Sequence, residues 1–331
     1  MVGKVTVVGS ATAGPPSLPR TRAGLAGGLV SLPGMMDCCL ALDVGGTKLA
    51  AGLVGQGGEV LARHRIPTPT GLGPDQLLDA VVGLARQAAR AAWRPPLACG
   101  VGCGGPMEPG GERVSPLNIP AWSGFPLRSA LADALQLPTY VDNDAKALAL
   151  GEGWVGAAVG CRDYLAMVVS TGVGAGIVSS GRLLDGRLGN AGHIGHLTVE
   201  PEGRTCPCGA RGCLEAEASG TAIRALTGRP PEQAPVEVVE RTGRLVGRAV
   251  AGVANLLDLD LALVAGSVAL GFGARFFAAA QREVEARARL AFSAGTRVRP
   301  GGLGADGPLV GAGALAWRGL GQLPPGAEGA T

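Results

Sequence analysis

The amino-acid sequence predicts an α/β protein made of two lobes. The chain has 331 residues, which is more than one domain of about 100–200 residues usually holds. Short apolar runs typical of strands alternate along it with longer segments of helical periodicity, and this order is typical of α/β lobes. No short-period repeat of the solenoid type is present in the sequence.

The first half of the chain begins with a disordered tail and continues with strands and helices. Residues 1–36 mix Pro, Gly, Ser and Arg without a regular period, so we expect disorder there. The segment CCLALDVGGTKLAAGLV from Cys38 predicts a strand, a glycine turn and a second strand, with the next turn at 55–58. Helices are expected over 74–92, 127–135 and 145–155, with strands at 97–101 and 139–141.

The second half is expected to add two strands, a Cys/His loop and two long helices. The strands lie at 164–170 and 176–178 and are joined by a glycine-rich turn. Helices over 244–257 and 274–288 flank a further strand at 261–265.

Composition argues against several functional classes. The net charge is only +3, without a basic block, and the aromatic fraction of 3% leaves few rings for base stacking. We therefore expect no nucleic-acid partner. A run of about 20 apolar residues free of Gly, Pro and charge is missing, as is a signal-peptide pattern, so we expect a cytoplasmic protein without a membrane partner.

Two glycine turns are candidate phosphate-binding elements. Asp43-Val-Gly-Gly-Thr-Lys48 and Ser170-Thr-Gly-Val-Gly-Ala-Gly176 each follow an apolar strand. Glycines let backbone N–H groups approach phosphate oxygens, and an adjacent acid can hold Mg²⁺ through water. The alternative is a plain hairpin turn. A third run, 100–105, fits G-x-G-x-x-G, but Pro106 and Pro109 stand where a dinucleotide fold needs a helix.

Asp144 is the candidate general base. Asp142-Asn143-Asp144 stands at a predicted strand-to-helix junction. Phosphorylation of a hydroxyl group requires an acceptor for its proton, and a carboxylate at a strand end can serve. The alternative role of Asp144 is to cap the following helix.

Three cysteines and a histidine are candidate metal ligands. Cys206, Cys208 and Cys213 follow His196 closely, a set that suits tetrahedral zinc. Because the protein would fill all four positions, this zinc should brace the loop. Free buried thiols or a redox pair are the alternative. The other five cysteines lie in or near apolar runs and receive no role.

Taken together, these motifs resemble the ROK family of sugar kinases and sugar-responsive repressors. The resemblance extends from Cys38 to about Leu320, and its most specific part is GNAGHIGHLTVEPEGRTCPCGARGCLEAEASG. DVGGTK and STGVGAG resemble the family's phosphate elements, and NDA resembles its catalytic turn.

The resemblance implies a fold, a reaction and partners. The fold is actin-like (ribonuclease H-like), with a small lobe over 37–148, completed by a C-terminal helix at about 307–322, and a large lobe over 149–306. ATP, Mg²⁺, a structural Zn²⁺ and a small-molecule sugar are the implied ligands, and a homodimer or homotetramer is the implied assembly. The implied reaction transfers a phosphoryl group from ATP to a hexose.

The resemblance also implies roles for individual residues, with Asp144 as the base. The residues expected around the sugar are Gly105, Asn118, Asn143, His193, His196 and Glu215. Those expected at the ATP phosphates, Mg²⁺ or adenosine are Asp43, Gly45, Gly46, Thr47, Lys48, Thr171, Gly172 and Gly266. His196 would bind zinc with one ring nitrogen and reach the sugar with the other.

The chain departs from the family pattern at three positions, and these affect the choice of substrate. His193 replaces a Glu that contacts sugar hydroxyls, Lys146 replaces an Asn, and Ala265 replaces a Gly. The 6-hydroxyl of glucose is the first expectation for the phosphorylated group, and an N-acetylhexosamine is the alternative. A sugar-responsive regulator is the alternative from another class, but the residues before Asp43 lack the pattern of a helix-turn-helix module.

Overall fold

The structure is a computed structural model that describes residues 37–323. These residues belong to one compact unit of the chain. The tail predicted over residues 1–36 lies outside the described residues. Within 37–323, no helix is long and apolar enough to cross a lipid bilayer.

The first sheet contains five strands in the order β3-β2-β1-β4-β5. Its strands are β1 (Cys38–Val44), β2 (Lys48–Gly55), β3 (Val60–Pro67), β4 (Cys99–Cys103) and β5 (Thr139–Asn143). β1 pairs antiparallel with β2 and parallel with β4, and β4 pairs parallel with β5. Helices α1 (Pro74–Ala89) and α2 (Leu127–Leu135) share an apolar core with this sheet.

The second sheet repeats the same topology with the order β10-β9-β6-β7-β8. Its strands are β6 (Tyr164–Val169), β7 (Val173–Ser179), β8 (Arg182–Leu183), β9 (Leu261–Ala265) and β10 (Arg297–Pro300). As in the first sheet, the first strand pairs antiparallel with the second and parallel with the fourth, here β6 with β7 and β9. The two predicted phosphate turns, β1–β2 and β6–β7, therefore occupy equivalent places in the two sheets.

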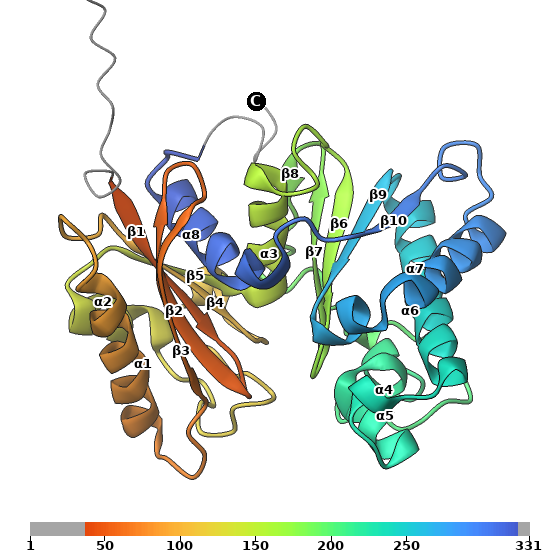
Figure 1. Cartoon of the computed structure of the whole chain (residues 1–331), viewed down its shortest axis with the longest axis horizontal. Coiled ribbons are helices and arrows are strands. Elements are labelled where there is room, and N and C mark those ends of the chain that lie inside the picture. The colour runs from red at the N-terminus through yellow and green to blue at the C-terminus, as the bar shows by residue number, and fades with distance from the viewer. Residues whose placement is uncertain (1–36, 324–331) are drawn as a thin grey trace, which may run out of the picture. The chain divides into compact units, whose positions relative to one another are not determined.

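Two helices lie between the sheets, α3 (Asp144–Val155) and α8 (Gly307–Gly319) (Figure 1). They pack against each other, with α3 also on β6 and β7 and α8 on β1, β2 and β4. Glycine permits this close approach: a Cβ on Gly311 of α8 would lie 2.6 Å from the carbonyl oxygen of Ala147 in α3. One apolar core thus contains residues from both sheets and both helices.

Four more helices belong with the second sheet: α4 (Leu214–Ala218), α5 (Gly220–Thr227), α6 (Val236–Leu257) and α7 (Ser267–Arg287). α6 and α7 pack along each other and share an apolar core with β6, β7 and β9. α7 is interrupted at Gly273, where φ is 60°. The 3₁₀ helices are η1 (Pro109–Gly111), η2 (Ile194–His196), η3 (Pro231–Gln233) and η4 (Gly304–Asp306).

The sequence-based elements agree with the structure where apolar patterning is strong. The predicted helix at 127–135 and strand at 261–265 have the observed bounds. The strand expected at 97–101 is shifted to Cys99–Cys103, and α6 begins eight residues before the expected residue 244. β3 was not predicted because it alternates half-buried and exposed residues such as Arg63 and Arg65, which weakens the apolar signal. The short α4, α5, β8 and β10 were also missed.

Candidate functional site

Three parallel strands bring the candidate acids to one edge of the first sheet. Asp43 of β1 is in register with Gly102 of β4, which is in register with Asp142 of β5. The carboxyl ends of parallel strands meet at the same edge, the usual place for ligand sites in α/β proteins. Gly102 also makes room for the neighbouring turn, since a Cβ there would lie 3.4 Å from the Cα of Asp144.

Asp144 is the first residue of α3, and Asn143 is the cap. The Oδ1 of Asn143 accepts a hydrogen bond from the Ala145 N–H at 3.0 Å. The Asp144 Oδ1 accepts from the same N–H at 2.8 Å. Burial raises the pKa of Asp144, whereas backbone hydrogen bonds and the charge of Lys48 lower it. Because Asn143 occupies the capping position, capping does not by itself account for the carboxylate of Asp144.

Asp43 is a second buried carboxylate close to Asp144. It is 6% exposed, and its Oδ2 lies 3.7 Å from Lys48 Nζ. Burial raises the pKa of Asp43 to about 6, the charge of Lys48 lowers it, and the charge of Asp144 raises it. Carboxylate oxygens in this setting suit a hard divalent cation, so the residues present fit Mg²⁺.

The two glycine turns face each other from the two sheets. Thr47 Oγ1 and Thr171 Oγ1 are 3.4 Å apart. The first turn requires glycine for space, since a Cβ on Gly46 would lie 2.5 Å from the backbone carbonyl oxygen of Asn118. A Cβ on Gly172 in the second turn would lie 2.8 Å from Glu215 Oε2, so Glu215 lies against that turn. In the first turn, the Gly45 N–H donates to the carbonyl oxygen of Lys48 at 3.1 Å. The structure thus brings the two predicted phosphate turns together at Thr47 and Thr171.

Gly266 lies at the start of α7, next to the β6–β7 turn. Its φ of 98° favours glycine, and its backbone packs against that of Val169. The neighbouring Ser267 Oγ lies 3.0 Å from Ser170 Oγ. Gly266 is therefore placed beside the second phosphate turn.

Most of the predicted sugar residues surround Gly105. A Cβ on Gly105 would lie 3.3 Å from His193 Nε2 and 3.5 Å from Asn143 Nδ2, and one on Gly104 would lie 3.4 Å from Asn118 Oδ1. The rings of His193 and His196 have centroids 6.1 Å apart. Burial lowers the pKa of His193, the charge of His196 also lowers it, and the charge of Glu215 raises it.

Glu215, in the first turn of α4, is a predicted sugar residue whose carboxylate is bound by the backbone of β7. Its Oε2 accepts a hydrogen bond from the Val173 N–H at 2.9 Å, so one carboxylate oxygen faces the start of β7. Glu215 therefore lies between the second phosphate turn and the His193 region.

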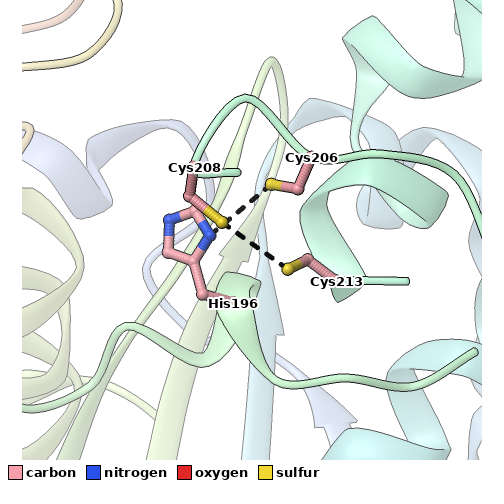
Figure 2. Close-up of side chains that lie close together, drawn as sticks. All are labelled: His196, Cys206, Cys208 and Cys213. Carbon is pink, nitrogen blue, oxygen red and sulfur yellow. Dashed lines mark hydrogen bonds between the residues drawn. The ribbon is translucent and has the colours of Figure 1, made fainter. Parts of the chain in front are cut away.

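The predicted metal ligands converge in one cluster (Figure 2). The ligand atoms of His196, Cys206, Cys208 and Cys213 all lie within 4.8 Å of one another. Cys206 Sγ is 3.7 Å from His196 Nδ1, and Cys208 Sγ is 3.8 Å from Cys213 Sγ. Zinc ligands at about 2.0–2.3 Å from the ion stand roughly 3.3–3.8 Å apart in a tetrahedron. The residues present therefore fit zinc, and the second ring nitrogen of His196 points away from Cys206 and Cys213 (Figure 2).

A cavity of about 290 Å³ lies beside the Asp142-Asn143-Asp144 turn. Its lining includes Met107, Asp142, Lys146, Asp185, Arg187 and Arg318. Neither Asp144 nor His193 lines it, so it is not the predicted sugar pocket.

Two of the charged residues at this cavity, Lys146 and Asp185, receive no role from the sequence. Lys146 was noticed only as a departure from the family pattern. Asp185 carries no local signal, because Lys146, the partner of its carboxylate, lies 39 residues away in the chain.

Comparisons with known proteins agree with this architecture. The model of the ROK family matches residues 39–318. An N-acetylmannosamine kinase of Citrobacter koseri is 38% identical over 250 residues, which cover 71% of this chain and 84% of the relative. A ROK hexokinase of Thermus thermophilus is 33% identical, with a TM-score of 0.72, and the match covers 86% of this chain and 99% of that one. A ROK glucokinase of Streptomyces griseus, solved with glucose and AMPPNP, is 28% identical with a TM-score of 0.76, over 85% and 99% of the two chains.

Proposed function

Since this chain belongs to the ROK family, we propose that it phosphorylates an N-acetylhexosamine, with N-acetylmannosamine as the substrate. The chain is an ATP-dependent sugar kinase with the actin-like fold expected from its sequence. The identity of the sugar is the new element of the proposal. It is supported by similarity to N-acetylmannosamine kinases at 36–38% identity, and it replaces glucose as the first expectation.

His193 is the observation that carries the choice of sugar. A carboxylate at this position can only accept hydrogen bonds, so it suits sugar hydroxyls but not a carbonyl oxygen. An imidazole has a nitrogen that donates, and a donor suits the carbonyl oxygen of an acetamido group. His193 Nε2 and Asn143 Nδ2 both lie close to Gly105, where the resemblance puts the sugar. We therefore expect an acetamido substituent to face His193.

The arrangement supports a separate role for each group of residues in the sugar kinase reaction. Asp144 would accept the proton of the attacking hydroxyl, and burial, which raises its pKa, makes the carboxylate more basic. Asp43 would hold Mg²⁺, which neutralises phosphate charge when bound. The glycines of the two turns would place backbone N–H groups against the phosphates. Gly266 would lie beside the adenosine.

Zinc would brace the segment that carries the sugar ligands. His196, Cys206, Cys208 and Cys213 would hold it, with His196 using Nδ1 and keeping Nε2 for the sugar. α4, which carries Glu215, begins directly after Cys213. Loss of zinc should therefore weaken sugar binding more than ATP binding.

The choice of sugar is tested with a panel of four: N-acetylmannosamine, N-acetylglucosamine, mannose and glucose. We expect the highest kcat/KM with N-acetylmannosamine. His193→Glu should shift the ratio of kcat/KM between acetylated and plain hexoses by more than about tenfold, which corresponds to one rearranged hydrogen bond of about 1.4 kcal/mol. A wild-type preference for glucose would contradict the proposed substrate. If all four rates change by one factor in the variant, His193 does not select the sugar.

The zinc proposal has its own test. Metal analysis of the purified protein should find about one zinc per chain, as one tetrahedral set holds one ion. Removal by a chelator should raise the Kd of the sugar while the Kd of an ATP analogue stays within about twofold. Unchanged sugar binding in a verified metal-free sample would refute the role of zinc.

The lobe bounds, the assembly and the location of the protein remain predictions of the sequence. The expected boundary between residues 148 and 149 falls inside α3, and the expected C-terminal helix corresponds to α8, which packs on the first sheet. A homodimer or homotetramer and a cytoplasmic location are proposed on the resemblance and composition alone.

A further inference from the structure

Lys146 is a buried lysine two residues after Asp144. Only 2% of its side chain is exposed, which is unusual for lysine unless its charge is paired. Its Nζ lies 2.9 Å from Asp142 Oδ1 and 2.7 Å from Asp185 Oδ1, and it donates to the carbonyl oxygen of Gly189 at 3.3 Å. An ammonium group has three N–H donors, so these three acceptors can occupy all of them.

On one side, Lys146 holds the catalytic turn. Asp142 Oδ1 also accepts a hydrogen bond from the Asn143 N–H at 2.7 Å. Asn143 in turn caps α3, whose first residue is Asp144. The carboxylate that pairs with Lys146 therefore fixes the Asp142–Asn143 peptide group, in the turn that leads to the predicted base.

On the other side, Lys146 holds the segment 185–192, which leads into His193. Within this segment, the Ala191 N–H donates to the carbonyl oxygen of Asp185 at 3.0 Å. Asn190 donates to the Met107 carbonyl oxygen at 2.8 Å and accepts from the Met107 N–H at 3.0 Å. Met107 follows the Gly105 turn. The segment 185–192 is thus tied both to the catalytic turn and to the turn below the predicted sugar site.

A purely stabilising role explains the contact of Lys146 with Asp142 but not its contact with Asp185. Asp142 is 16% exposed, and burial raises its pKa while the charge of Lys146 lowers it, so a nearby cation helps that group to ionise. Asp185 is 55% exposed. An exposed carboxylate is well solvated and gains little stability from an ion pair. The contact with Asp185 is better explained by the position that it gives to the segment 185–192.

We propose that Lys146 is a positioning residue that holds Asp144 and His193 in register across the bound sugar. The bridge Asp142–Lys146–Asp185 joins the turn that carries the predicted base to the segment 185–192, which leads into His193, a predicted sugar contact. Productive phosphoryl transfer needs the hydroxyl and the base within hydrogen-bond reach. Loosening the bridge should therefore affect the sugar and leave ATP binding intact. The proposal rests on the sugar kinase activity and not on which hexose is the substrate.

The first test uses Asp185→Asn, which leaves Lys146 paired with Asp142 and the buried charge compensated. We expect the KM for the sugar to rise about fivefold or more and kcat to fall, while the KM for ATP stays within about twofold. Glu240→Gln is the matched control. It removes a carboxylate from the surface ion pair between Glu240 of α6 and Arg275 of α7. The control should retain all wild-type constants. Each variant is compared with wild type on the sugar that the wild type converts fastest.

The second test uses Lys146→Met and the double variant. Lys146→Met should give a larger loss than Asp185→Asn, and the double variant should be no worse than Lys146→Met alone, because both changes remove one bridge. Wild-type kinetics in a folded Asp185→Asn variant would overturn the proposal. So would an equal rise in the KM values of sugar and ATP. If Lys146→Met fails to fold, Asp185→Asn decides alone. A preference for glucose over N-acetylmannosamine would contradict the proposed substrate and leave this comparison valid.

Discussion

Asn143 and Asp144 are adjacent polar residues at the start of α3, and the structure gives them different surroundings. Asn143 is the N-cap, with its Oδ1 accepting from the Ala145 N–H. Asp144 lies one residue later, close enough to Asp43 for its charge to raise the pKa of that residue. Asn143 therefore occupies the N-cap position that the sequence alone could equally assign to Asp144, although both side chains accept from the Ala145 N–H.

Replacing Asp144, the proposed base, should lower the rate of phosphoryl transfer and leave sugar binding unchanged. We expect Asp144→Asn to lower kcat by about 10²–10⁴-fold, because an amide cannot accept the hydroxyl proton. The melting temperature should change little, since Asn143 still caps α3 and the new amide oxygen can accept from Ala145. Steady-state kinetics and calorimetric titration with sugar measure the two effects. Turnover near that of wild type would remove Asp144 from the mechanism.

Asp43 should reduce stability at neutral pH when no metal is bound. Its pKa is raised from 3.8 to about 6 in the folded protein. A raised pKa means that protonated Asp43 stabilises the fold below about pH 4 and that this contribution is lost as the pH rises through 6. Asp43→Asn should therefore raise the free energy of unfolding at pH 7.5 in EDTA, by as much as about 3 kcal/mol.

Denaturant titrations at pH 4 and pH 7.5 check this prediction. The difference in the free energy of unfolding between wild type and variant should be small at pH 4 and grow toward pH 7.5. ATP turnover by the variant should be strongly reduced, because the predicted Mg²⁺ ligand is gone. A variant less stable than wild type at pH 7.5 would show that Asp43 is already stabilised as an anion.

At the scale of elements, α6 and α7 approach each other closely through glycines. A Cβ on Gly243 would lie 2.9 Å from Ala279 Cβ, and one on Gly247 would lie 2.9 Å from Ala280 Cα. These two positions are one helical turn apart on α6, so they form a single face against α7. Gly252, farther along α6, has open space around it.

Alanine substitutions at Gly252 and Gly243 of α6 should therefore change the stability of the protein in opposite directions. Gly252→Ala should stabilise the protein by about 0.5–1 kcal/mol, because alanine is the better helix former and meets no neighbour. Gly243→Ala should destabilise it by about 1–3 kcal/mol, because the added methyl group forces α7 away. Thermal unfolding of the two variants gives the comparison. A shift of the same sign in both would mean that the α6–α7 packing is looser than described.

At the scale of the whole described unit, one core and one buried acid join the two sheets. Glu152 at the end of α3 is fully buried. Its Oε2 accepts hydrogen bonds from the N–H groups of Ala157 at 2.8 Å and Gly302 at 3.0 Å, and its Oε1 accepts from Leu303 at 3.3 Å. These bonds fix the connection from β10 toward α8, the second helix between the sheets.

Removing this acceptor should weaken the whole unit without dividing it. Glu152→Gln replaces one accepting oxygen with an NH₂ group that faces backbone N–H donors, so we expect a loss of about 2 kcal/mol or more. Unfolding should remain a single transition followed by both far-UV and near-UV circular dichroism, because both sheets share a core. Glu240→Gln on the surface should change stability by less than about 0.5 kcal/mol. Two separate transitions in Glu152→Gln would contradict the shared core.

The sequence alone determined the features that depend on local spacing. Two glycine turns after apolar strands, an acid at a strand-to-helix junction and a close Cys/His set are each encoded within a few residues. Their chemistry follows from residue type, because φ, donor number and ligand reach are local properties. For this reason the Cys/His cluster and the fold class could be predicted before any contact was known.

The tertiary structure decided what depends on contacts between distant residues. Thr47 and Thr171 are 124 positions apart and meet only because the two sheets place equivalent turns face to face. The contact of His193 with Gly105 and the ion pair of Lys146 with Asp185 likewise join residues that are far apart in the sequence. No sequence periodicity encodes such pairs. They form because burial of the apolar surfaces of separate elements also places the polar residues at the ends of those elements next to one another.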